Sequence, residues 1–303
     1  MDGLRRTWRP DWPCPVGQIW STWRRGAGDP TYRIESGRHW RGLGTPAGPA
    51  TLCVAVDATA GEVVAEAWGP GAPWALDHLP GMLGADDSRA GMPGLHEAVR
   101  RADHQYPHWR VGRGGYVLDA LTPAIIEQKV TGQEAFAGFR RLVTRYGTVA
   151  PGPGAALRLY VQPDASALRR VPSWEWLRMS IDSARSTTLV RAARVADALQ
   201  RTVGRPDAER LLCAVPGIGV WTAAEVRSRA HGDPDAVSFG DYHVARSIGW
   251  ALIGEEIDDA ALAELLEPYR GHRYRVQRLL ELAGYSHPRR GARMAPRTHL
   301  PVR

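Results

Sequence analysis

The chain has 303 residues, a length typical of about two domains, and its 44% hydrophobic content excludes wholesale disorder. It contains no apolar run of the about 18 residues that a membrane span needs, no signal-type apolar core after Arg5, Arg6 and Arg9, and three distant cysteines that cannot form a four-cysteine metal site. A net charge of +7 indicates a polyanionic partner, of which nucleic acid is the first candidate and an anionic membrane the second. We expect a cytoplasmic protein.

The first part of the chain predicts an arm followed by a small domain. Residues 1–30 are rich in Trp, Arg and Pro, which predicts an irregular arm with one short helix. Residues 31–91 combine short β-prone runs with a segment of helical apolar spacing, which predicts a small α+β domain. The expected strands cover residues 31–36, 51–58 and 62–68, with a turn at 59–61, and the expected helix covers 73–83.

Helical periodicity dominates from residue 92 onward, and good helix formers fill the periodic segments. Proline is tolerated only near a helix start, so we expect Pro123 there. Ser183 or Ser186 is the expected cap of the helix that includes residues 189–199. We expect an all-α domain over residues 92–287 and a basic tail over 288–303. The other expected helices lie near 118–126, 136–146, 207–213, 220–230, 241–253, 260–266 and 272–284.

The most informative local motif is a glycine-containing turn between two predicted helices. Residues 211–226 read LLCAVPGIGVWTAAEV, with the turn at Pro216, Gly217, Ile218 and Gly219. Glycine permits positive φ and the close approach of another chain. The amides of the turn, with the dipole of the following helix, can bind one phosphate. Taken alone, the motif also fits an ordinary turn between packed helices.

Asp241 is the candidate catalytic carboxylate. It follows Gly219 by 22 residues, within the sequence SFGDYHV, and is expected at the start of a helix. The positive end of the helix dipole holds a carboxylate there in its ionised form. Asp241 alone also fits an N-cap, in which case Asp233 and Asp235 are the next candidates.

The hairpin and the spaced aspartate together resemble the helix-hairpin-helix DNA glycosylase superfamily, and its type II 3-methyladenine (alkyl-purine) branch in particular. VPGIGVWTAAEV and SFGDYHVARSIGWAL carry the resemblance. Residues 121–134, LTPAIIEQKVTGQE, resemble the family's AIxxQxxS helix, and residues 267–280 resemble its closing helix. The resemblance spans roughly residues 30–285. It implies a mainly α fold with a small α+β N-terminal domain, damaged double-stranded DNA as partner, and no obligate protein partner.

The resemblance also implies roles for single residues. Asp241 would stabilise an oxocarbenium-like sugar, and the hairpin would clamp a DNA phosphate. Trp221 stands where lyase-competent relatives carry a lysine, which implies a monofunctional enzyme in a chain whose only lysine is Lys129. An aromatic face attracts a cationic purine by roughly 0.5–2 kcal/mol. The implied base pocket consists of Trp221, Tyr242, Trp174, Trp176 and Glu225.

Several of these positions have a second interpretation. Glu225 falls where the branch can carry a tyrosine, which leaves the breadth of the aromatic pocket open. Lys129 stands where relatives carry an apolar wedge, and it either intercalates its stem or is a solvated helix residue. Trp221, Trp174 and Trp176 fit core packing as well as a pocket. The expected DNA contacts are Gln128, Lys129, Pro216, Gly217, Ile218, Gly219, Thr222, Arg270 and Arg273.

The C-terminal segment is strongly basic. Residues 269–303 hold nine arginines against one acid, Glu281, and form either a solvated face or a set of phosphate contacts. The resemblance implies no redox cofactor, zinc or nucleotide. It does imply one structural monovalent cation, Na⁺ or K⁺, on the backbone carbonyls of Cys213, Val215 and Ile218.

The predicted function is hydrolysis of the N-glycosidic bond of alkylated purines in duplex DNA, by base flipping, as a step of base excision repair. Two alternatives stay open. One is a glycosylase of the same superfamily for a different lesion. The other is a helix-hairpin-helix DNA-binding protein without catalysis, against which the presence of Asp241 argues.

Overall fold

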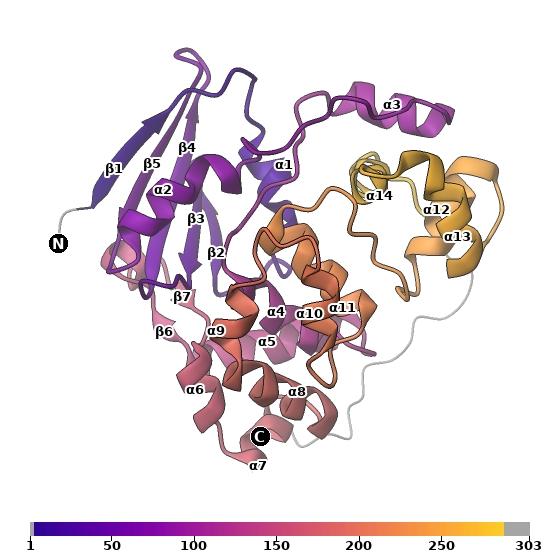
Figure 1. The fold of residues 1–303 in the computed structure, drawn as a ribbon. Helices are drawn as coiled ribbons and strands as arrows, with labels where there is room; N and C mark the ends of the chain where they lie inside the picture. Colours follow the sequence, from indigo (N-terminus) through magenta and orange to yellow (C-terminus); the bar gives the residue numbers. More distant parts are fainter. Residues whose placement is uncertain (1–2, 288–303) are drawn as a thin grey trace.

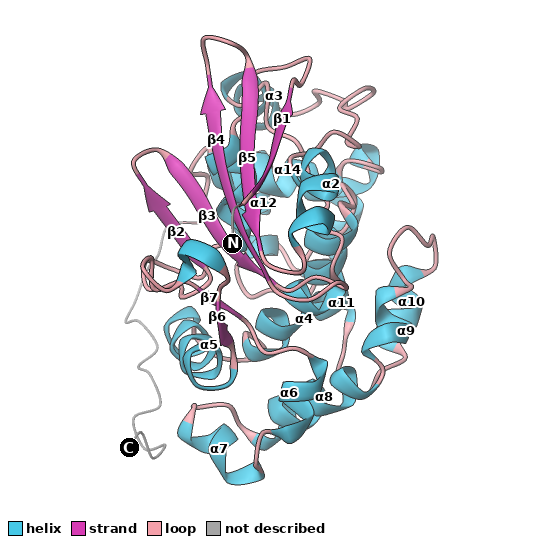
Figure 2. Ribbon diagram, turned by 90° about the vertical axis from the view of Figure 1, so that its left-hand side faces the viewer, coloured by secondary structure: helices cyan, strands magenta, loops and turns pink. Residues whose placement is uncertain are grey.

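A computed structural model describes residues 3–287, in which an antiparallel sheet packs beside a larger group of helices (Figure 1). The sheet has five strands in the order β1-β5-β4-β3-β2. Alternate residues of β5 are buried, because one face of the sheet is covered by helix α2, as Figure 2 shows. The strands are β1 (Leu4–Trp8), β2 (Tyr32–Glu35), β3 (Arg38–Leu43), β4 (Ala50–Asp57) and β5 (Glu62–Trp68), and α2 spans Ala72–Met82.

The three predicted strands and the predicted helix of this region are confirmed, and α1 (Val16–Trp20) is the expected short helix. The prediction of an irregular arm is wrong at β1, which pairs with β5 from Leu4 opposite Ala67 to Trp8 opposite Val63. None of the five residues of β1 is fully buried, because it is an edge strand, so its sequence shows no apolar face that would mark a strand. β3 was not expected either. Near its end it contains Gly42, which packs closely against the backbone of Tyr160.

The helices form the larger part of the structure and confirm the mainly α fold. Helix α4 lies at their centre, with every residue except Asp119 buried, and it packs against α5, α8, α9 and α11. The helices after α2 are α3 (Glu97–Gln105), α4 (Val117–Ile126), α5 (Gly132–Tyr146), α6 (Ala165–Arg170), α7 (Ser173–Arg178), α8 (Ser183–Arg194), α9 (Ala196–Gln200), α10 (Ala208–Cys213), α11 (Val220–Val226), α12 (Val244–Ile253), α13 (Asp259–Leu266) and α14 (Arg273–Leu282), and β6 (Thr148–Val149) pairs with β7 (Tyr160–Val161).

The predicted positions of a proline and of a helix cap differ from the structure. Pro123 lies inside α4, beyond its first turn, where it removes one helical hydrogen bond. The cap of α8 is Asp182, whose carboxylate accepts a hydrogen bond from the Arg185 amide at 3.0 Å, and the predicted caps Ser183 and Ser186 lie within the helix. No helix within residues 3–287 has both the length and the apolar character needed to cross a bilayer.

Helix α14 is fastened to the loop before α3 by a buried ion pair. The Arg275 guanidinium donates to both carboxylate oxygens of Asp87, at 2.8 and 2.6 Å, and both side chains are almost fully buried. The other arginines of the described part of the predicted basic segment also form ion pairs, which range from half-buried to exposed. The pairs are Arg270 with Glu267, Arg273 with Asp235 and Arg278 with Glu281; residues 288–303, the predicted tail, lie outside the described residues.

We predict that Arg275→Ala lowers the free energy of unfolding by about 3–5 kcal/mol, because Asp87 would stay buried without its partner. Arg270→Ala is the control, since Arg270 is exposed and pairs with the exposed Glu267, and its loss should cost at most about 1 kcal/mol. Urea denaturation of both variants measures the difference. Equal losses would mean that the Arg275 pair does not hold α14 in place.

Candidate active site

A tight turn joins α10 to α11. Gly217 has a φ of +100°, and a Cβ there would lie 2.1 Å from the Thr188 hydroxyl of α8, so the turn needs glycine at this position. Ile218 is buried, and its amide donates to the Val215 carbonyl at 3.0 Å. Gly219 is exposed, and no atom lies within 4 Å of a Cβ built on it. Both glycines are exposed, but a side chain at Gly217 would meet α8 and one at Gly219 would meet only solvent.

Gln128 ties the turn to the end of α4. Its amide nitrogen donates to the Gly217 carbonyl at 3.0 Å and to the Thr222 hydroxyl at 2.8 Å. Thr222 is buried, so these two predicted DNA contacts instead hold the turn from the inside. Lys129 follows the end of α4, is exposed, and has a φ of +53°. Lys129 is therefore solvated, as one interpretation expected, but it lies in a turn after α4 and not in the helix.

Asp241 lies opposite α11, on the loop that leads into α12. Its Oδ2 atom accepts a hydrogen bond from the Trp221 indole nitrogen at 3.3 Å. Its Oδ1 atom accepts from the amides of His243, at 2.8 Å, and Val244, at 3.3 Å. Helix α12 thus begins three residues later than predicted, but the carboxylate still bonds to its first amides. These donors fix the direction of both carboxylate oxygens.

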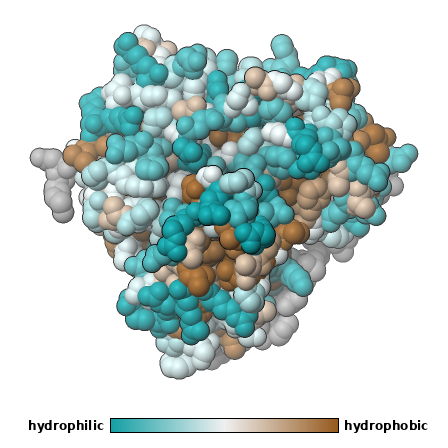
Figure 3. Space-filling model, in the orientation of Figure 1, coloured by the Kyte–Doolittle hydropathy of each residue, from teal (hydrophilic) through white to brown (hydrophobic). Residues whose placement is uncertain are grey.

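Two aromatic residues accompany this carboxylate: Trp221 contacts it, and Tyr242 follows it in the sequence. Trp221 is half-buried and donates to Asp241, so its ring is held at a fixed angle. Tyr242 is 69% exposed, and the Arg246 guanidinium lies over its ring at 4.4 Å. Figure 3 shows apolar side chains among polar ones on the surface around α10 and α11. The site therefore combines one oriented carboxylate with an accessible aromatic surface.

The other predicted aromatic pocket residues lie on α7, which packs against α8. Trp176 is in the core, so the alternative of core packing holds for it. Trp174 is 63% exposed. Among the described residues, no ring contact or hydrogen bond connects either tryptophan to Trp221 or Asp241, and the structure does not bring them into this site.

Glu225 belongs to a buried group of charges behind Trp221. One carboxylate oxygen pairs with Arg229 at 2.6 Å. A second buried pair joins Arg25 to Glu127 at 2.7 Å. Burial alone would raise the pKa of Glu225, but Arg229 and the hydroxyl of Ser238 outweigh it and hold this pKa below its usual value. The position predicted for a pocket residue is thus occupied by an ionised, paired carboxylate.

The remaining predicted candidates are engaged elsewhere. Asp233 pairs with Arg227 at 2.6 Å, and Asp235 accepts from the Arg273 guanidinium at 2.8 Å. Arg273, a predicted phosphate contact, is thus paired with Asp235 in the structure. The two aspartates are unsuited to replace Asp241 for the same reason.

Helix α8 carries a cation that the sequence analysis did not identify. Arg191 is exposed and makes no hydrogen bond or ion pair within residues 3–287. It follows Thr188 by three residues, and residues at that spacing share a helix face. Arg191 is thus placed on the side of α8 that meets the turn at Gly217. No local sequence pattern indicates this position of Arg191, because the contact between Thr188 and the turn at Gly217 joins segments far apart in the chain.

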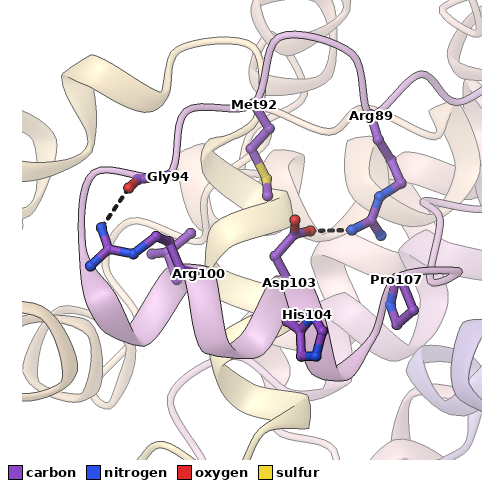
Figure 4. Close-up of a pocket in the computed structure, with 8 residues that line it drawn as sticks. Arg89, Met92, Gly94, Arg100, Asp103, His104 and Pro107 are labelled. Carbon is purple, nitrogen blue, oxygen red and sulfur yellow. Dashed lines mark hydrogen bonds and ion pairs between the residues drawn. The ribbon is translucent and has the colours of Figure 1, made fainter.

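A cavity of about 400 Å³ lies elsewhere, between α3 and the loop before it (Figure 4). Its guanidinium groups are already paired, that of Arg89 with Asp103 and that of Arg100 with the Gly94 carbonyl. Asp241 is not among its lining residues. Within residues 3–287, no cluster of three or more His, Cys, Asp and Glu side chains could hold a metal ion. We therefore place the candidate site at Asp241.

Comparison with known proteins gives no matching family model and no matching curated protein. Solved structures do match. The 3-methyladenine DNA glycosylase from Archaeoglobus fulgidus superposes with a TM-score of 0.74 at 18% identity, over 92% of this chain and 99% of that one. The 8-oxoguanine glycosylase/lyase of Clostridium acetobutylicum has a TM-score of 0.69 at 9% identity, over 93% and 98%.

A 3-methyladenine DNA glycosylase of fission yeast, Schizosaccharomyces pombe, in complex with abasic DNA has a TM-score of 0.51 at 14% identity, over 64% of this chain and 94% of that one. The chain therefore has the fold of the helix-hairpin-helix DNA glycosylases, and the predicted fold is confirmed.

We predict that an added methyl group affects stability at one glycine of the turn and DNA binding at the other. Gly217→Ala should lower the free energy of unfolding by about 1–3 kcal/mol, since it strains the backbone and meets Thr188. Gly219→Ala should leave stability nearly unchanged. It should instead weaken binding to duplex DNA by about 1.5–3 kcal/mol, the value of one hydrogen bond to a charged group such as a phosphate. Urea denaturation and fluorescence anisotropy measure the two quantities, and full DNA affinity in Gly219→Ala would place the interface elsewhere.

Proposed function

We propose that this protein is a monofunctional DNA glycosylase that removes alkylated purines of the 3-methyladenine type from duplex DNA. The observation that carries the proposal is the Asp241 carboxylate, held by the Trp221 indole and two amides in a glycosylase fold. The enzyme bends the duplex and rotates the damaged nucleotide out of the stack. The extruded base then stacks near Trp221, where an aromatic face favours a cationic purine.

Asp241 acts on the sugar in this mechanism. As the N-glycosidic bond breaks, positive charge develops on the sugar, and the carboxylate stabilises it and orients a water toward C1′. The two oxygens are already directed by their donors, so little reorganisation accompanies the reaction. A 3-methyladenine or 7-methylguanine base carries positive charge and leaves readily. The mechanism therefore needs no general acid.

DNA phosphate binds, in this proposal, at the exposed face of the turn. Pro216 and Gly219 lie on that face, and the first amides of α11 have no helical acceptor. Arg191 adds a free positive charge beside the turn. Lys129 is the proposed wedge, its aliphatic stem filling the space left by the base and its ammonium group reaching phosphate.

A monovalent cation at the hairpin remains part of the proposal. Backbone carbonyl oxygens are suitable ligands for Na⁺ or K⁺, and the proposed ones belong to Cys213, Val215 and Ile218. The Val215 oxygen accepts one hydrogen bond from the Ile218 amide and retains a second lone pair. Such an ion would stabilise the turn and would take no part in bond cleavage.

One observation favours a different lesion within the same class of enzyme. Glu225, where a tyrosine would widen an aromatic pocket, is buried and ionised beside Arg229. The aromatic surface near Asp241 is therefore smaller than that arrangement would give. The alternative of a DNA-binding module without catalysis is less well supported, because such a module does not need a carboxylate oriented as that of Asp241 is.

Incubation with single-lesion duplexes tests the proposed function. We expect strand cleavage of an alkylated-purine duplex only after alkali, because a monofunctional enzyme leaves an intact abasic site. Borohydride should trap no covalent complex on abasic DNA, since Trp221 is not a nucleophile and Lys129 is the only lysine. A trapped complex that is lost in Lys129→Ala would contradict the monofunctional mechanism. No excision from any lesion duplex would contradict the enzyme class.

We predict that Asp241→Asn lowers the single-turnover excision rate by at least about 100-fold, the scale of losing one positioned electrostatic group. Asparagine has nearly the same size and keeps an oxygen for the amides of His243 and Val244, so stability and DNA affinity should change little. Asp258→Asn is the matched control, because Asp258 caps α13 through the Ala261 amide at 2.9 Å. Its excision rate should equal that of the wild type. A near wild-type rate for Asp241→Asn would reduce Asp241 to a cap.

A further inference from the structure

The loop that carries Asp241 is bonded to the helix that carries Trp221. The hydroxyl of Ser238, three residues before Asp241, donates to a carboxylate oxygen of Glu225 at 2.7 Å. Glu225 lies one helical turn after Trp221 on α11. The Asp241 amide in turn donates to the Ser238 carbonyl at 3.2 Å. The loop and α11 are therefore joined at Ser238 as well as at the carboxylate itself.

Two further hydrogen bonds hold the same loop from its other side. The Ser238 amide donates to the Gln277 side chain of α14 at 3.3 Å. The Gly240 amide donates to the Asp259 carboxylate of α13 at 2.9 Å. Gly240 has a φ of +86°, which favours glycine and gives the chain a tight bend before Asp241. The backbone on either side of Ser238 is thus fixed to three helices.

The bond between Glu225 and Ser238 is protected from water. Ser238 is 1% exposed, and only 12% of the Glu225 side chain is exposed. The other carboxylate oxygen of Glu225 bonds to Arg229, whose Nε atom donates to the Thr22 carbonyl at 3.0 Å. A hydrogen bond to an ionised group is short and strongly directional when it is buried. It therefore sets the position of the loop more closely than apolar contact does.

We propose that Glu225 is a positioning residue for Asp241, acting through the hydroxyl of Ser238. The inference rests on the proposed role of Asp241 in glycosidic-bond cleavage. Without the Glu225–Ser238 bond, the loop can move relative to α11. The indole of Trp221 and the carboxylate then separate, and the negative charge no longer lies where the sugar becomes cationic.

This role differs from that of a residue that contacts the extruded base. A positioning residue acts on the sugar step, which every substrate shares, so its loss lowers excision of every lesion by the same factor. A base contact changes the ratios between lesions. A panel of two or more excised lesions therefore separates the two roles of Glu225.

Ser238→Ala is the main test, since it removes the bond and leaves both buried charges paired. We expect single-turnover excision to fall by about 10-fold on every lesion, the scale of one hydrogen bond to a charged group. Ser228→Ala is the matched control. Ser228 is also buried, but its hydroxyl donates to the backbone carbonyl of Glu225, and its removal should leave the rate unchanged.

A double-mutant cycle tests the pair itself. Glu225→Ala combined with Ser238→Ala should excise no more slowly than the slower single variant, because both changes remove one interaction. Glu225→Gln keeps an acceptor for Ser238 and should restore much of the rate lost in Glu225→Ala. Strictly additive losses, or losses confined to one lesion, would overturn the proposal.

Binding to abasic-site duplexes gives a readout that needs no excision. The wild type should prefer a cationic pyrrolidine sugar analogue to a neutral tetrahydrofuran, because Asp241 faces the sugar. Ser238→Ala should lose most of this preference while it keeps its affinity for tetrahydrofuran. Absence of the preference and of excision in the wild type would contradict the role of Asp241. An unchanged preference and rate in Ser238→Ala would contradict only the positioning role of Glu225.

Discussion

Buried arginine–carboxylate pairs connect the separate parts of this structure. Arg41 of β3 reaches Asp119 of α4 at 3.4 Å while its guanidinium lies 4.3 Å from the Trp23 ring, which joins the sheet to the central helix. Arg275 joins α14 to the loop before α3. A planar guanidinium can donate several hydrogen bonds and stack on an aromatic ring at once, which a lysine cannot do. A chain with a single lysine thus uses arginine as its internal connector.

The same pairs explain where sequence analysis succeeded and where it failed. Strand β5 and helices α5 and α12 were predictable because their apolar residues recur with a local period, and strand β4 because it is a short run of β-prone residues. The net charge of +7 did not indicate where on the structure the unpaired cations lie. Arg273 and Arg275 look like free cations in the sequence, and only the fold reveals their partners Asp235 and Asp87. Charge density along a chain does not distinguish a binding surface from an internal ion pair.

The candidate site shows the same division between local and long-range information. Asp241 and the turn at Gly217 could be predicted, because a short motif and one spacing identify them. The bond from Trp221 to Asp241 could not, since it depends on how a loop returns to α11. The bond from Ser238 to Glu225 also joins two separate segments. Motifs identified the candidate carboxylate, and tertiary structure determined its orientation.

Strand β1 affects how the sheet meets other molecules. It lies at one end of the strand order and pairs with β5. Without β1, the largely apolar β5 would be the edge strand. The residues of β1 include the exposed Arg5, and charged side chains on an edge strand oppose pairing with a second sheet. A chain trimmed before residue 9 would expose the hydrogen-bonding edge of β5. Residues 4–8 therefore cover an edge at which a second sheet could otherwise pair.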